Sequence, residues 1–148
     1  LEFTAYPSNT SVTVGTRFSL ALDVLPGPEM HDYAPGAEEK GYKVIGFVLD
    51  QPEIARIEAV AYPESEIYYF EQLDEHVPGY QAPFTILQEV GMNADPQSEE
   101  IMSDLDALTL TGNLNYQACD DAICFLPHII PVSFTVDLDM PDRQRANR

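Results

Sequence analysis

The chain has 148 residues, a usual size for one domain, and 45% of them are hydrophobic, which is enough to form a core. Its 25 Asp and Glu residues outnumber its 7 Lys and Arg residues, so the formal net charge is -18. Nucleic acids and anionic lipids are bound through Lys and Arg, so this balance argues against both as partners.

The two ends of the sequence give an expectation about its origin. The chain begins with Leu1 and not with Met, which favours a piece of a longer exported protein. We expect one folded domain over residues 1–140. Residues 141–148 hold three of the basic residues and are predicted to be a tail or linker.

A period of two in the apolar residues predicts three strands that each bury one face, because successive strand side chains point to opposite faces. These strands cover residues 17–24, 108–116 and 132–138. Their predicted inner face consists of Phe18, Leu20, Leu22, Leu108, Leu110, Leu114, Val132, Phe134 and Val136.

Weaker strand patterns fill much of the remaining sequence. They cover residues 3–6, 12–14, 42–49, 54–61, 67–70 and 84–90. Clusters of Pro and Gly, Pro78-Gly79 among them, are interpreted as turns between these strands. Many short strands with frequent turns predict an all-β antiparallel sandwich or barrel. Residues 96–106 fit either a short helix or a polar loop.

The only two cysteines, Cys119 and Cys124, lie between the strands predicted at 108–116 and 132–138. If these strands are antiparallel neighbours, the connection can hold the two Cα atoms about 5 to 6 Å apart, which suits a disulfide. We therefore expect an intramolecular bridge. As a structural staple it would contribute roughly 2 kcal/mol, because the loop that it closes is short.

Two other uses of the cysteines are weaker. A zinc site could combine Cys119, Cys124 and His128, but structural zinc needs a fourth ligand, which only His31 or His76 could supply. A cysteine hydrolase needs a positioned histidine with an orienting partner, and the sequence offers no motif for one.

Local charge indicates how the cysteine pair would react. Asp120 and Asp121 follow Cys119 directly, and no basic residue lies nearby in the sequence. Negative neighbours disfavour a thiolate, so the pair is a poor first nucleophile. This setting suits a disulfide that is attacked by the thiolate of another protein.

The sequence around the cysteines resembles a known family. Residues 110–124 read LTGNLNYQACDDAIC and are followed by Pro127 and the last strand. This run resembles the N-terminal periplasmic domain of the DsbD thiol:disulfide interchange protein. Looser similarity covers residues 31–36 and the segment around Tyr62-Pro63 and 66–68.

The resemblance implies an immunoglobulin-like antiparallel β-sandwich in the bacterial periplasm, as a component of a protein-disulfide reductase. Cys119 and Cys124 would be the catalytic residues, with Cys119 the less exposed and Cys124 the attacked one. An aromatic cap would cover them, formed by Tyr62 and Pro63 with help from Tyr33 or Tyr116. Gln117 and Asp120 would be further neighbours of the site. Ala61 stands where the family has a Phe.

The same resemblance implies the partners. The domain would accept electrons from a membrane-embedded or fused redox domain and pass them to thioredoxin-like periplasmic proteins, as a monomer and without a cofactor. The alternative from a different functional class is a non-catalytic module that binds a protein and keeps a fixed structural disulfide.

Overall fold

A computed structural model describes residues 2–120 and 123–139 of the chain. The predicted tail at 141–148 lies outside the described residues, and so does Asp121. Strands dominate the described part, and the two termini of this part belong to different sheets.

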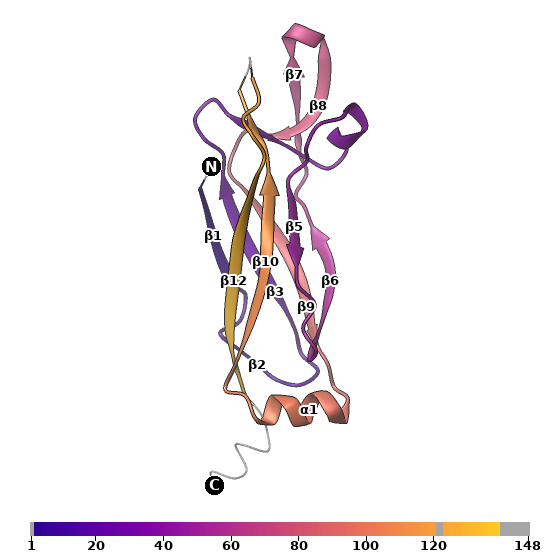
Figure 1. Cartoon of the computed structure of the whole chain (residues 1–148), viewed down its shortest axis with the longest axis vertical. Coiled ribbons are helices and arrows are strands. Elements are labelled where there is room, and N and C mark those ends of the chain that lie inside the picture. The colour runs from indigo at the N-terminus through magenta and orange to yellow at the C-terminus, as the bar shows by residue number, and fades with distance from the viewer. Residues whose placement is uncertain (1, 121–122, 140–148) are drawn as a thin grey trace.

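Two four-stranded sheets form the body of the molecule (Figure 1). The first sheet has the order β1-β3-β9-β6 and consists of β1 (Glu2–Pro7), β3 (Arg17–Leu25), β9 (Phe84–Met92) and β6 (Ala55–Ala61). The second has the order β2-β12-β10-β5 and consists of β2 (Ser11–Val12), β12 (His128–Leu138), β10 (Ala107–Tyr116) and β5 (Gly46–Leu49). All these pairs are antiparallel except β2 with β12.

The core lies between these two sheets and draws apolar side chains from both. Every residue of the predicted inner face is at most 6% exposed. These side chains share one cluster with others from β5 and β9, so the alternation of each strand buries one face against the opposite sheet. The predicted all-β sandwich is confirmed.

Pairing of β10 with β12 sets the geometry that the site depends on. The register runs from Ala107 opposite Asp137 to Tyr116 opposite His128. The two strands are therefore antiparallel neighbours, as predicted, and their connection projects from one end of the sandwich (Figure 1). Both cysteines lie in this connection.

A third, smaller sheet lies at that end of the molecule (Figure 1). Its order is β11-β4-β8-β7, with β11 (Ala118–Cys119), β4 (His31–Tyr33), β8 (Glu75–Tyr80) and β7 (Glu66–Phe70). Two short 3-10 helices, η1 (Ala37–Lys40) and η2 (Glu71–Leu73), belong to the same region. The sequence patterns predicted β7 but neither β4 nor β8.

Pro78-Gly79 does not form the predicted turn, because both residues lie inside β8. Pro78 has no N–H to give to a ladder, but its carbonyl accepts a hydrogen bond from the Ala34 N–H at 3.1 Å. Gly79 lies opposite Glu66 of β7 and Tyr33 of β4, and a Cβ there would approach the Asp32 carbonyl oxygen to 3.3 Å. The small residue thus fits a crowded central strand.

The segment left open between helix and loop is a helix, α1 (Pro96–Ser103), at the opposite end of the sandwich (Figure 1). Asp95 caps it by accepting from the Ser98 N–H at 3.0 Å, and Pro96 begins it, where a missing N–H costs nothing. The buried Met102 anchors it to the core. Within the described residues, no helix has the length and apolar character for crossing a membrane.

Candidate functional site

Cys119 and Cys124 form an intramolecular disulfide with an S–S distance of 2.06 Å. Their Cα atoms are 4.0 Å apart, closer than the expected 5 to 6 Å, because the two residues face each other directly across an antiparallel bridge. Backbone hydrogen bonds flank them, from the Asp120 N–H to Ile123 O and from the Phe125 N–H to Ala118 O, both at 2.9 Å. The cysteines thus occupy the non-hydrogen-bonded pair, where opposed Cα atoms come closest.

The hairpin that carries the disulfide has other restraints. The Asp120 carboxylate accepts from the Ile123 N–H at 2.8 Å. The Gln117 side-chain amide donates to Phe125 O at 3.0 Å, and the Tyr116 ring stacks on the His128 ring at 5.6 Å. These contacts explain locally why Tyr and Gln precede the first cysteine, since each ties one side of the hairpin to the other.

The two cysteines have opposite environments. Cys119 is 1% exposed and belongs to a buried cluster with Tyr33, Ala37 and Val77. Cys124 is exposed to solvent. The Cys124 end of the bridge therefore faces solvent, whereas the Cys119 end, on the edge strand β11, is buried in this cluster.

Stacked aromatic rings accompany the buried sulfur. His31 lies opposite Cys119 in the pairing of β4 with β11. Its ring stacks on Tyr68 at 3.7 Å and meets the edge of Tyr33 at 4.9 Å, and Tyr33 in turn stacks on Tyr42 at 4.2 Å. Burial raises the pKa of Tyr33 to about 12, helped by Tyr42 and Glu75, so its phenol is neutral at ordinary pH.

The structure separates the predicted cap residues into two groups. Tyr33 shares the buried cluster of Cys119. The Tyr62 ring instead packs against the main core, and its hydroxyl accepts from the Phe47 N–H at 3.1 Å. The Pro63 carbonyl accepts from the Tyr80 hydroxyl at 2.7 Å. Tyr62 is thus outside the cluster around Cys119, and its role as a lid stays a prediction.

Asp32 is a buried carboxyl group beside the site. It lies opposite Ala118 on β11 and opposite Tyr80 on β8, so it occupies the middle of the small sheet. It is 1% exposed, and neither of its carboxylate oxygens has a hydrogen-bond partner among the described residues. This burial raises the pKa of Asp32 to about 7. Burial also raises the pKa of the Tyr116 hydroxyl, with a contribution from Asp32.

A metal site finds no support in the described residues. No three His, Cys, Asp or Glu side chains gather there as ligands would, and both sulfurs are bonded to each other. His31, one of the two histidines that could have completed the zinc site, lies buried among aromatic rings.

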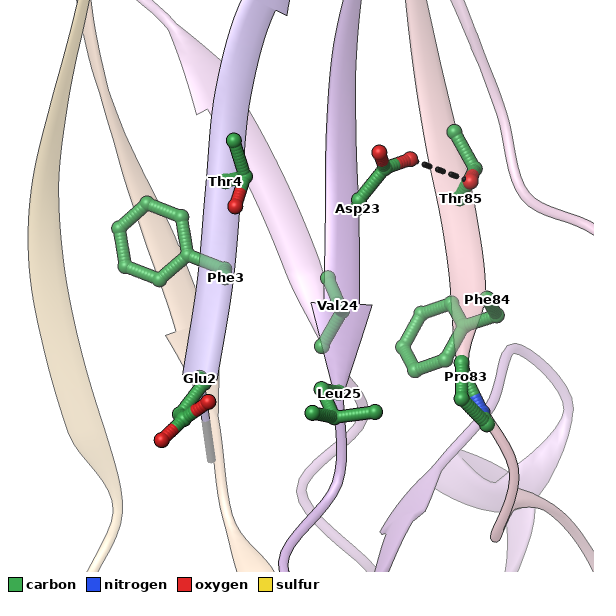
Figure 2. A pocket seen from close by; sticks show the side chains of 9 residues that line it. All are labelled: Glu2, Phe3, Thr4, Asp23, Val24, Leu25, Pro83, Phe84 and Thr85. Atoms are coloured by element: carbon green, nitrogen blue, oxygen red, sulfur yellow. Dashed lines mark hydrogen bonds between the residues drawn. The ribbon is translucent and has the colours of Figure 1, made fainter.

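A groove of about 480 Å³ lies along the ends of β1, β3 and β9. Figure 2 shows its lining, in which Asp23 projects toward Thr85 and the Phe84 ring lies beside Val24. The Asp23 carboxylate already accepts from the Thr85 hydroxyl at 2.6 Å and from the Tyr6 hydroxyl at 2.9 Å. No cysteine or histidine is among the nine lining residues, so the groove lacks the chemistry that the disulfide end has.

Comparisons with known proteins add no family to this picture. No protein-family model matches the chain, and a search of the curated proteins finds no significantly similar relative. The resemblance of residues 110–124 to the DsbD domain therefore rests on the sequence pattern alone.

Several residues of this end were not predicted as parts of the site. His31 and Asp32 lie on a strand of three residues, too short to show a periodicity, and come beside the cysteines only through long-range pairing. Phe125 and Leu126 are exposed apolar residues next to Cys124. A sequence signal for them existed, because residues 122–136 contain no Asp, Glu, Lys or Arg in an otherwise acidic chain.

Proposed function

We propose that this domain exchanges its Cys119–Cys124 disulfide with the thiols of other proteins. One observation carries the proposal, namely that the bridge joins a buried cysteine to an exposed one at the end of a projecting hairpin. A sulfur that an external thiolate can reach is the first requirement for exchange.

The reaction would proceed in two displacements. A partner thiolate attacks Cys124 Sγ, a new S–S bond forms, and the bond to Cys119 breaks with its electron pair leaving on Cys119 Sγ. That sulfur takes a proton from water. A second thiol of the partner then attacks the mixed disulfide and releases Cys124, which is also protonated. The partner is oxidised by two electrons, and the bridge is reduced to a dithiol.

Local charge bears on which of the two proteins supplies the attacking thiolate. The half-buried Asp120 carboxylate stays beside Cys119 and is tied to the turn by the Ile123 N–H. A negative neighbour disfavours a thiolate on this domain, so the oxidised domain is better suited to receive an attack than the reduced domain is to start one.

A structural staple is the competing function, and the hairpin itself argues against it. Backbone hydrogen bonds on both sides of the cysteines, together with the Gln117 and Asp120 side-chain contacts, already close the same loop. The added restraint is small, because a loop this short yields roughly 2 kcal/mol in the chain-entropy model. Retention of the bridge for stability alone would bring little benefit.

The wider setting of the proposal comes from the resemblance and the strand order. Without β2, the two main sheets contain seven strands, which in chain order are β1, β3, β5, β6, β9, β10 and β12. The first, second, fifth and fourth of these form one sheet, and the third, sixth and seventh form the other. This is the strand order of an immunoglobulin constant-type sandwich. This order supports an immunoglobulin-like, DsbD-type domain. On this proposal it acts in the periplasm between a membrane-embedded or fused redox domain and thioredoxin-like proteins.

A redox titration tests the proposal. The protein is equilibrated in buffers of reduced and oxidised dithiothreitol, its thiols are alkylated, and intact mass gives the fraction of dithiol while circular dichroism reports the fold. We expect a reversible two-electron transition in a protein that stays folded throughout. A bridge that opens only when the domain unfolds would establish the staple instead.

A further inference from the structure

Exposed apolar residues flank Cys124 in the sequence, and we call them the apolar tip. It consists of Ile123, Phe125, Leu126 and Ile129, with exposed fractions of 56%, 45%, 81% and 69%. All four lie within five residues of Cys124 along one arm of the hairpin and its continuation into β12. Large exposed apolar residues gathered in one short segment are typical of contact surfaces in soluble proteins.

The charge pattern separates this surface from the rest of the molecule. Residues 122–136 lack acidic and basic side chains altogether, although the chain has 25 Asp and Glu. An acidic surface keeps proteins soluble and apart through repulsion. The apolar tip lacks this repulsion, and it includes the neighbours of the exposed Cys124.

A pocket adjoins the apolar tip. It has a volume of about 320 Å³ and lies between the start of β12, the end of β10 and the segment before β5. Val44, Tyr116, Pro127 and Ile129 provide its apolar walls, and Lys43 is the one formally charged residue in its lining. The stacked rings of Tyr116 and His128 connect this pocket to the arm that carries Cys124.

The exposure of Cys124 indicates what kind of partner binds to this surface, namely a protein that carries a thiol. A thiolate must come to bonding distance of Cys124 Sγ, so any protein that delivers one necessarily covers the neighbouring side chains. Phe125 and Leu126 would then be buried against the residues that flank the incoming cysteine. Burial of a large apolar side chain stabilises the complex, whereas a charged flank would lose its hydration without gaining a partner.

We propose that the apolar tip and the adjoining pocket form a docking surface that selects protein thiols flanked by uncharged, apolar side chains, one of which enters the pocket. This inference rests on the proposed function, since it names the class of thiol that reaches Cys124. Hydrophilic small thiols of the cell would gain nothing from this surface.

Two peptide thiols test the selection. The peptides are acetyl-Gly-Leu-Cys-Leu-Gly-amide and acetyl-Gly-Gly-Cys-Gly-Gly-amide, which are both uncharged and differ only in the side chains beside the cysteine. One peptide molecule opens the bridge to a mixed disulfide, and a second molecule completes its reduction. The rate of opening is measured by intact mass, with dithiothreitol as a reference thiol. We expect the Leu-flanked peptide to react about tenfold faster, which corresponds to about 1.4 kcal/mol.

Substitutions locate the selecting surface. The double variant Leu126→Ser, Ile129→Ser should abolish the preference between the peptides and leave the rate with dithiothreitol unchanged. Val48→Ser is the matched control, because Val48 is 58% exposed but lies on β5, away from the cysteines. This control should keep the full preference.

The possible failures are distinguishable. Equal rates for the two peptides, with normal reduction by dithiothreitol, would overturn the docking surface and leave the exchange function standing. Resistance of the folded protein to all three thiols would overturn both. Size-exclusion chromatography tests whether the apolar tip is instead a contact between two copies of the chain. If the parent protein is a dimer and the double variant is a monomer, the proposal is overturned.

Discussion

Strand β12 passes through two regions of the molecule that differ in how its apolar residues are buried. Within the sandwich, from Val132 to Leu138, buried and exposed residues alternate without exception. At its start, from His128 to Pro131, no residue is buried, and Ile129 remains 69% exposed. Residues 132–138 of this strand therefore contribute side chains to the core, whereas residues 128–131 leave apolar side chains exposed.

This difference shows where folding explains the sequence and where it does not. In the sandwich each apolar residue removes its side chain from water, which is the main stabilising contribution to a fold. At the hairpin end the apolar residues stay in water, so the free energy of folding gives no reason for them. Such departures from local consistency are expected at functional sites, and here they coincide with the exposed half of a disulfide.

The largest effect should come from the core. We expect Phe134→Ala to lower the free energy of unfolding by about 3 to 5 kcal/mol, because it removes a 3% exposed ring that packs against Phe47. Leu126→Ser should change it by less than about 0.5 kcal/mol. Urea denaturation of both variants measures the contrast. A large loss for Leu126→Ser would show that the apolar tip is structural after all.

Asp32 should give the next effect, as a dependence of stability on pH. Its pKa is near 7 in the folded protein and near 3.8 when exposed, so the folded state holds the extra proton between these values. Stability should therefore fall as pH rises from about 4 to about 7 and then level off, by on the order of 4 kcal/mol.

The variant Asp32→Asn isolates this contribution, since an amide does not titrate. We expect it to be more stable than the parent protein at pH 8 and to differ little at pH 4, as measured by urea denaturation at both values. If the difference between the two proteins is the same at both pH values, the Asp32 carboxyl group does not titrate as described.

A smaller effect should appear in the kinetics of the bridge. When Cys124 is attacked, Cys119 leaves as a thiolate inside the aromatic cluster, where burial opposes the charge. Tyr33→Ala should admit water there and speed reduction by dithiothreitol roughly threefold or more, because a stabilised thiolate leaves faster. Tyr33→Phe keeps the ring and should react like the parent.

Tyr62→Ala sharpens the same comparison. The cap implied by the DsbD resemblance predicts faster reduction of this variant too, whereas the packing of Tyr62 on the main core favours Tyr33 as the covering ring. We expect the Tyr33→Ala effect to be the larger. A greater acceleration for Tyr62→Ala, with the fold intact by circular dichroism, would restore Tyr62 as the lid.

The parts of the fold that sequence could predict share one property. Strands such as β3, β10 and β12 are long enough for their alternation to be read, and each buries one face. All six weaker strand predictions also correspond to strands, with bounds shifted by a few residues. A period of two is a local signal, so it can be recognised without knowing which strands pair with each other.

The small sheet could not be predicted, because its strands are specified by partners far away in the sequence. Strand β4 has only three residues, and β8 contains a Pro-Gly pair that locally indicates a turn. For the same reason sequence identified the cysteines and their neighbours Gln117 and Asp120 but not His31 across from Cys119. The resemblance implied that Cys119 is the less exposed cysteine. The physical reason, its burial with Tyr33, Ala37 and Val77, could be seen only in the fold.

The central claim is that an external thiolate attacks Cys124 and displaces Cys119, and trapping of the mixed disulfide tests it most directly. The remaining cysteine of the Cys119→Ala variant and of the Cys124→Ala variant is activated as a mixed disulfide with thionitrobenzoate. Each variant is then incubated with a thioredoxin-like protein that keeps its attacking thiol but lacks its resolving cysteine, and the adducts are measured by intact mass. We predict rapid and stable capture by Cys119→Ala, through its exposed Cys124, and slow or no capture by Cys124→Ala. Preferential capture by Cys124→Ala, or by neither folded variant, would contradict the account.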